Sequence, residues 1–317
     1  MPLTSANTRR ARLLLLPLLC LLPACASAAP TAAQVVDFLA PWQFSPTVLS
    51  LTLLTLVVYV NGLRVRHARG QRSSVARPFA FLLGVVLIYF VLQTRFDYWA
   101  QHMFYIHRGQ HLVLHHIGPF LIALSVPHKV LRAGIPDRWW DAWVGPVMRS
   151  WPVRGTVAVL MDPILAPVLF VVGIGFWLIP AVHFDAMLSL PLYNLMNWSM
   201  LVDGLPFWWL VLNPEPKPPA RIGYGMRIFI LWIVMFPQIA IGAFIGLSTH
   251  DLFHVYAICG RLYPISPITD QQIGGLIIWI PGAMMSAISM LLVLAHTAGH
   301  RRAARFEAVG VARPATS

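Results

Sequence analysis

Long apolar segments separated by short polar connections run through most of the chain. Seven of them approach the length of about 20 mostly apolar residues that a membrane-spanning helix requires. They run from Pro46 to Leu63, Phe79 to Leu92, Phe104 to Val126, Val157 to Val182, Ala186 to Leu212, Met226 to Leu247 and Gly274 to Ala295. The pattern predicts an all-α, polytopic membrane protein with seven transmembrane helices in one domain, residues 29–300, followed by a basic tail, residues 301–317.

The N-terminus has the pattern of a secretory signal. Arg9, Arg10 and Arg12 precede an apolar run, Leu13–Leu22, and a cluster of small residues follows it. This order predicts a signal peptide over residues 1–28. The alternative is an uncleaved first helix, for which the apolar run is short. Cleavage would leave Cys259 as the one remaining cysteine, so an internal disulfide is not expected.

Basic residues alternate between the connections and predict the orientation. They gather between the first and second spans, between the third and fourth, after the fifth and after the seventh, whereas the other connections hold little more than Arg95 and Arg261. Positively charged loops stay in the cytoplasm. We therefore expect a multi-pass protein with the mature N-terminus outside and the C-terminus inside.

Composition agrees with a membrane protein and narrows the function. The 317 residues are 58% hydrophobic and 11% charged, whereas about a quarter of a soluble domain is charged. The net charge of +12 fits basic loops beside anionic membrane lipids, and no motif indicates a nucleic-acid partner. No soluble catalytic motif such as G-x-S-x-G, a Walker loop or H-E-x-x-H appears, so we do not expect an enzyme.

The third apolar segment carries an unusual set of histidines. His107, His111 and His115 are spaced i, i+4 and i+8, which places them on one face of a helix. Ionisable side chains within a membrane are costly and usually functional, and imidazole is the commonest metal ligand. This stripe therefore indicates metal, haem or proton chemistry.

Other histidines fall at the same outer level in the predicted topology. His250 and His254 repeat the i, i+4 spacing after the sixth span, and His183 lies on the fourth-to-fifth connection. We predict His107 and His111 as the leading metal ligands, with these three next. The further candidates are His102, His115, Asp203 within the fifth span and Asp270 near the seventh.

Two motifs resemble a known family. The H-x-x-x-H pair of the third span and the run Asp270-Gln-Gln-Ile-Gly-Gly followed by Trp279-Ile-Pro-Gly are similar to the signatures of CtaG-type cytochrome c oxidase assembly proteins. The resemblance implies an assembly factor for a haem–copper oxidase, located in the bacterial cytoplasmic (inner) membrane as a multi-pass protein, that handles or delivers copper at the periplasmic face. Its expected partners are the oxidase catalytic subunit or other assembly factors.

The resemblance has two departures at histidines of the family. The family often has Trp-His-x-Pro at the end of the fourth span, where this chain has Leu178, and a histidine of the fifth span corresponds to Asn197. His183, His115 or His254 could compensate. A membrane redox protein that holds haem b between paired histidines, and a copper transporter, stay open as alternatives. The seventh-span motif itself could serve capping and packing as readily as ligand binding, with Asp270 at the start of that helix.

Overall fold

The computed structural model describes residues 32–71 and 74–309, and these form helices and no strand. The predicted signal peptide lies outside the described residues. The chain divides into two units, Met1–Phe38 and Leu39–Ser317. The first contains most of helix α2, Ala32–Leu39. The second contains the other helices of the described residues, including all that carry the predicted site.

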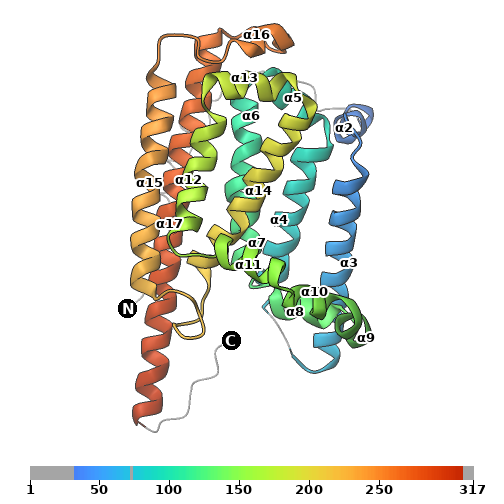
Figure 1. Cartoon of the computed structure of the whole chain (residues 1–317), viewed down its shortest axis with the longest axis vertical. Coiled ribbons are helices and arrows are strands. Elements are labelled where there is room, and N and C mark those ends of the chain that lie inside the picture. The colour runs from blue at the N-terminus through green and yellow to red at the C-terminus, as the bar shows by residue number, and fades with distance from the viewer. Residues whose placement is uncertain (1–31, 72–73, 310–317) are drawn as a thin grey trace, which may run out of the picture. The chain divides into compact units, whose positions relative to one another are not determined.

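The second unit is a helical array whose long members run side by side (Figure 1). Its longer helices are α3 (Pro46–Ala68), α4 (Ala76–Gln93), α12 (Leu165–Trp177), α14 (Leu190–Leu212), α15 (Tyr224–Leu247) and α17 (Pro267–Val309). Its shorter ones are α5 (Arg95–His102), α6 (Phe104–His111), α7 (Gly118–Leu124), α8 (His128–Gly134), α9 (Asp137–Trp139), α10 (Gly145–Arg149), α11 (Trp151–Leu160), α13 (Pro180–Leu188) and α16 (Val255–Cys259). Two π-helical segments, η1 (Leu112–Ile117) and η2 (Trp140–Val144), complete it.

Four described helices are long and apolar enough to cross a membrane: α3, α4, α15 and the Pro267–Arg302 part of α17. The pair α11 and α12 would make a fifth span, bent by 74°. The fourth predicted span is therefore not one straight helix, and the fifth begins at Leu190 because Ser189 separates α13 from α14. Helix α14 has 23 residues, but its asparagines and Asp203 make it less apolar.

The third predicted span consists of α6, η1 and α7 in succession, so its middle is π-helical rather than α-helical. A π-helical segment inserts a wider turn and is common at functional sites. The Nε1–H of Trp208 donates to the carbonyl oxygen of His115 over 3.0 Å, so a carbonyl within this segment gains a side-chain partner. The wider turn begins directly after His111, so the later residues of the third segment do not keep strict α-helical spacing from it.

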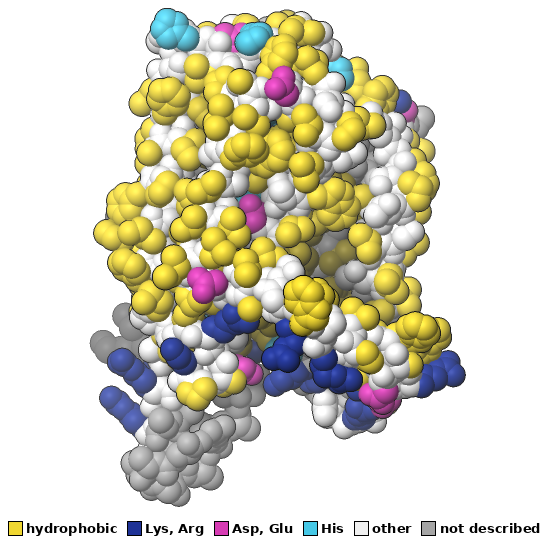
Figure 2. Space-filling model, viewed as in Figure 1, with side chains coloured by type: hydrophobic (Ala, Val, Ile, Leu, Met, Phe, Trp, Pro, Cys, Tyr) yellow, Lys and Arg dark blue, Asp and Glu magenta, His cyan; other side chains and the backbone are white. Residues whose placement is uncertain are grey.

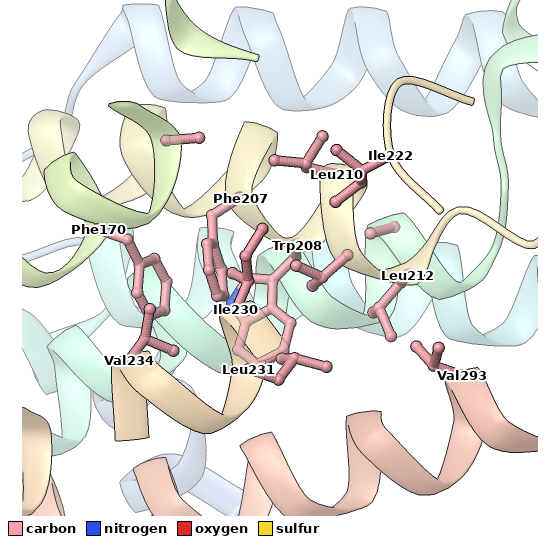
Figure 3. Packing of buried hydrophobic residues seen from close by; sticks show 13 residues of the cluster. Phe170, Phe207, Trp208, Leu210, Leu212, Ile222, Ile230, Leu231, Val234 and Val293 are labelled. Carbon is pink, nitrogen blue, oxygen red and sulfur yellow. The ribbon is translucent and has the colours of Figure 1, made fainter. Parts of the chain in front are cut away.

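An aromatic core packs below this segment. Figure 3 shows Phe170 of α12 beside Phe207 and Trp208 of α14. The rings of Phe170 and Phe207 stack with centroids 3.7 Å apart, and the three side chains are at most 1% exposed. This core holds α14 against η1 and thereby positions the polar side chains that these two segments carry.

Charged and imidazole side chains separate along the unit. Figure 2 shows Lys and Arg gathered at one end of the visible face and exposed histidines at the other. The predicted orientation would place the basic end in the cytoplasm. Helix α17 continues beyond Arg302, into the predicted basic tail, as far as Val309.

Glycines allow α15 and α17 to approach closely. A Cβ on Gly275 would meet the backbone of Gly246 and the carbonyl oxygen of Gly242, and a Cβ on Gly242 would lie 2.8 Å from the backbone of Gly275. Gly242 and Gly246 form a G-x-x-x-G pair on α15, a spacing that lets membrane helices pack backbone to backbone. Gly275 of the Asp270 motif therefore serves the contact with α15, whereas a Cβ on Gly274 would meet the Phe104 ring of α6.

Replacing Gly275 by alanine should destabilise the protein by about 1–3 kcal/mol, because the backbone of α15 would have to move away. The matched control is Gly225→Ala on α15, where no atom lies within 4 Å of the added Cβ. That change should be neutral or stabilising by up to about 1 kcal/mol. Unfolding in mixed micelles measures both variants, and equal midpoints would contradict the close helix contact.

Candidate functional site

A buried cluster of imidazoles and hydroxyls lies between α6, α13, α14 and α16. The Nε2 atoms of His107 and His111 lie 3.1 Å apart, and both side chains are buried. The i, i+4 spacing on α6 places the two rings together, with centroids 4.5 Å apart. The predicted proximity of these two residues is confirmed.

Tyr256 of α16 connects this pair to a third histidine. Its hydroxyl lies 2.9 Å from His107 Nδ1 and 3.0 Å from His183 Nε2. His183 is completely buried on α13, and its Nδ1–H donates to the carbonyl oxygen of Trp177 over 3.1 Å. Sequence reasoning missed Tyr256, because a tyrosine in a short outer segment carries no signal of its own.

The hydrogen bonds assign the protons of the cluster. Since His183 Nδ1 donates to a carbonyl, its Nε2 has the lone pair and accepts from the Tyr256 hydroxyl. The tyrosine oxygen then accepts from His107 Nδ1–H. The partner on one ring nitrogen fixes the state of the other, so the lone pair of His107 Nε2 faces His111.

Asn197 of α14 occupies the other side of His111. Its Oδ1 lies 3.2 Å from His111 Nε2, and the side chain is 4% exposed. An amide oxygen is an acceptor, so His111 Nε2 carries a proton in this arrangement. A histidine at position 197 would therefore fall within reach of the His107–His111 pair.

His115 lines one small cavity together with His111, but its ring does not join the His107–His111 pair. The wider π-helical turn directs its ring toward His116, with the two Nδ1 atoms 3.1 Å apart, and toward Asp203, whose Oδ1 lies 3.1 Å from His115 Nε2. His116 Nε2 lies 3.0 Å from Gln238 Oε1 on α15. These four residues form a second, deeper cluster.

The proton count in the deeper cluster depends on Gln238. Its Nε2 donates to the carbonyl oxygen of Val234 over 3.2 Å, so its Oε1 faces His116 and accepts. His116 Nδ1 then accepts from His115 Nδ1–H, which leaves a lone pair on His115 Nε2 against the Asp203 oxygen. Neither atom has a hydrogen-bond partner in the part of the chain that the structure describes, so the 3.1 Å approach of His115 Nε2 to Asp203 Oδ1 would be favourable only with a proton on one of the two.

The other predicted ligands lie elsewhere. His250 and His254 are exposed in the α15–α17 connection, and the His254 ring packs against Phe184. His102 Nδ1 donates to the carbonyl oxygen of Tyr98 over 2.7 Å. Within the described part of the chain, no three His, Cys, Asp or Glu side chains are grouped closely enough to hold a metal ion. The five leading residues therefore do not form a single preformed site.

Asp270 serves a different purpose from the expected cap of its own helix. Its Oδ2 and Oδ1 accept from the backbone N–H groups of Phe104 and Tyr105, over 3.1 and 2.8 Å, and Arg261 pairs with it. These are the first two residues of α6, so Asp270 caps the helix that carries His107 and His111. Its oxygens are occupied by these donors, so it is a positioning residue for the cluster.

Gln271 fixes the segment next to it. Its Nε2 donates to the carbonyl oxygens of Ile245 and His250, and its Oε1 accepts from the Leu252 N–H over 2.8 Å. The Asp270-Gln271 pair thus holds α6 and the end of α15 against the start of α17. The seventh-span motif could serve ligand binding or capping and packing, and these contacts favour capping and packing.

A second missed network lies beside the cluster. Tyr193 Oη donates to Asp97 Oδ1 over 2.7 Å, and Gln110 Nε2 donates to the same oxygen over 2.8 Å. The sequence feature that could have indicated this network is Gln110, a polar residue within the apolar third segment. A cavity of about 480 Å³ reaches Asp97, Tyr193 and Asn197.

Cys259, the free thiol of the described residues, lies at the end of α16 and is partly exposed. Desolvation raises the pKa of its thiol. The thiolate is the metal-binding form of cysteine, so the raised pKa leaves less thiolate in the absence of a bound metal.

Comparison with known proteins places these features in a family. A family model described as cytochrome c oxidase caa3 assembly factor (Caa3_CtaG) matches residues 57–299. An uncharacterized protein of Mycobacterium leprae (strain TN) is 27% identical over 289 residues, 87% of this chain and 42% of the relative. Another, from Mycobacterium bovis (strain ATCC BAA-935 / AF2122/97), is 26% identical over 265 residues, 79% of this chain and 38% of the relative.

The chain thus spans about two fifths of the length of the curated relatives it matches. No solved structure is similar at a significant level.

Proposed function

Because the chain belongs to the Caa3_CtaG family of cytochrome c oxidase assembly factors, we propose that it handles copper for the oxidase through the His107–His111 pair. Copper is here a cargo that is passed on to the oxidase or to another assembly factor. The observation that carries the proposal is the 3.1 Å separation of the two Nε2 atoms within a buried polar cluster.

That separation suits two ligands of one ion. Metal–imidazole bonds of about 2.0 Å at a near-tetrahedral angle place two ligand nitrogens about 3.3 Å apart. Imidazoles bind copper well. Asn197 Oδ1 lies at a similar distance, 3.2 Å, from His111 Nε2, so it would be the nearest additional donor. On copper binding, the proton on His111 Nε2 would have to move to Nδ1 or leave.

Tyr256 and His183 form a hydrogen-bonded chain on the side of His107 that faces away from the proposed ion. The Tyr256 hydroxyl accepts from His107 Nδ1–H and thereby presents the His107 Nε2 lone pair. Outer partners of this kind orient ligands and raise their basicity. Asp270 fixes the backbone at the start of the same helix. We propose His183 as a reserve ligand that could reach the ion after release of Tyr256.

The cavity that reaches Asp97, Tyr193 and Asn197 offers an access route for the ion. Asp97 accepts from Gln101 Nε2 over 2.9 Å as well as from Tyr193 and Gln110. A carboxylate beside the route would attract a cation. Copper would then approach His111 past Asn197.

Asn197→His should tighten copper binding about tenfold or more, because a third imidazole would join the pair. Competition against a copper(I) chelator measures the change in affinity. Asn194→His is the matched control, since Asn194 is exposed and lines the same cavity without contacting His111. An equal effect of the two substitutions would contradict the assignment of Asn197 to the ligand set.

The experiment that tests the function is deletion of the gene in its host. Oxidase activity and the copper content of the purified oxidase should fall, and added copper should restore part of both. Complementation by the His107→Ala, His111→Ala double variant should fail at low copper. Loss of oxidase that keeps its full copper content would support assembly without copper handling. A wild-type amount of active oxidase would contradict both proposals.

A further inference from the structure

A small cavity lies between the two histidine clusters. Its volume is about 30 Å³, and its polar lining consists of Arg108, His111, His115, His116 and Gln238. A cavity needs at least about 10–15 Å³ to hold one water molecule. This one is therefore large enough for one monatomic ion or about two waters, and too small for sulfate, phosphate or an organic anion.

Arg108 places a positive charge against this cavity. The side chain is 3% exposed, and its Nε and Nη2 atoms have no hydrogen-bond partner among the described residues. Its guanidinium lies 5.0 Å from the centre of the Phe104 ring. A cation–π contact contributes about 0.5–2 kcal/mol, which is less than the several kcal/mol that burying an ion costs. The Tyr256 hydroxyl also hydrogen-bonds the Arg108 side chain, but a neutral hydroxyl does not balance the charge, which therefore requires a further partner.

The surrounding carboxylates do not supply that partner. No carboxylate is among the described residues that line the cavity. Asp270 is paired with Arg261 and bound by two backbone N–H groups. Asp203 lies against the far nitrogen of His115. An ion that enters the cavity would meet a guanidinium with two unpartnered nitrogens, Nε and Nη2, and the imidazoles of the lining.

We infer that the cavity binds one halide-sized anion, chloride being the available representative, as the counter-ion of Arg108. The anion accepts hydrogen bonds from Nε and Nη2 of Arg108, the two donors without a protein partner. Its charge offsets a cation that immediately neighbours His107 in the chain. The inference concerns the copper-free protein and does not depend on the proposed function.

Anion exchange at constant ionic strength tests the inference. The purified, copper-free full chain is heated in sodium gluconate, sulfate, chloride or bromide, and unfolding is followed by tryptophan fluorescence. Chloride and bromide should raise the Tm saturably, by several degrees at about 100 times Kd. Gluconate and sulfate should give no saturable rise, because neither fits; exclusion of sulfate from the protein surface gives only a gradual rise that does not saturate. Identical Tm values in all four salts would overturn the inference and indicate a cavity filled by water.

A charge-removing variant locates the site. Arg108→Gln should abolish the halide dependence of the Tm, whereas Arg154→Gln, at an exposed position on α11, should keep it. Equal halide dependence of Arg108→Gln and the parent would overturn the assignment. If Arg108→Gln does not fold, equilibrium binding of radiolabelled chloride to the parent decides. One chloride per chain, displaced by bromide but not by gluconate, supports the inference, and none contradicts it.

Discussion

Replacing His107 and His111 together by alanine should reduce bound copper from about one ion per chain to none, because both imidazole ligands are lost. The two rings project from adjacent turns of α6 with their Nε2 atoms 3.1 Å apart. Each single alanine variant should weaken binding strongly, since one imidazole cannot hold the ion alone. Copper per chain after dialysis, with affinity from chelator competition, measures the effect.

Two further variants separate ligand loss from misfolding. Tyr256→Phe keeps the ring but removes the hydroxyl between His107 and His183, and it should weaken copper binding about 10–100-fold, as is typical for outer partners of metal ligands. His250→Ala combined with His254→Ala should keep most of the copper, because both side chains are exposed. Copper lost only from this last variant would move the site to the exposed outer loop.

Asp270→Asn should destabilise the fold by about 3–5 kcal/mol, because it leaves Arg261 as a poorly compensated, largely buried charge. The Asp270 side chain is completely buried and that of Arg261 is 14% exposed. The substitution also weakens the cap on α6 formed with the N–H groups of Phe104 and Tyr105. Unfolding in mixed micelles measures the loss, and copper affinity should fall with it.

A surface ion pair provides the comparison. Asp137 pairs with Arg132 over 2.7 Å, with the two side chains 74% and 40% exposed, so Asp137→Asn should cost less than about 1 kcal/mol. The double variant Asp270→Asn, Arg261→Gln should recover part of the stability, since no unpaired charge remains. Equal effects of Asp270→Asn and Asp137→Asn would contradict the structural importance of the buried pair.

Much of the helical architecture could be predicted from apolar run length. The segments beginning near Pro46, Phe79, Met226 and Gly274 all fall within long helices, because burial in a membrane requires continuous apolar stretches. The break between α11 and α12 was not predictable in this way. Asp162 and Pro163 lie at this break. Asp162 Oδ1 accepts from the N–H groups of Ile164 and Leu165, but the run length of an apolar segment does not record a bend.

The candidate site was predictable only as far as local geometry determines it. Helical spacing of four placed His107 beside His111, because neighbouring turns bring such residues together. The same rule did not indicate that the His115 ring contacts His116 and Asp203 rather than the pair, and the π-helical segment η1 that carries it leaves no clear pattern in one sequence.

Long-range contacts account for the remaining differences. Asp270 caps a helix 166 residues away, and Tyr256 lies 149 residues from His107. Such pairs depend on how helices pack, which periodicity within one segment does not encode. The family motif around Asp270 marked the place, but its partners became evident only from the structure.

X-ray absorption of the copper-loaded protein tests the central proposal most directly. We expect at least two imidazole nitrogens at about 2.0 Å from the metal, with imidazole scattering lost in the His107→Ala, His111→Ala variant. A spectrum dominated by sulfur ligands, or an imidazole signal unchanged in that variant, would contradict copper binding by the His107–His111 pair.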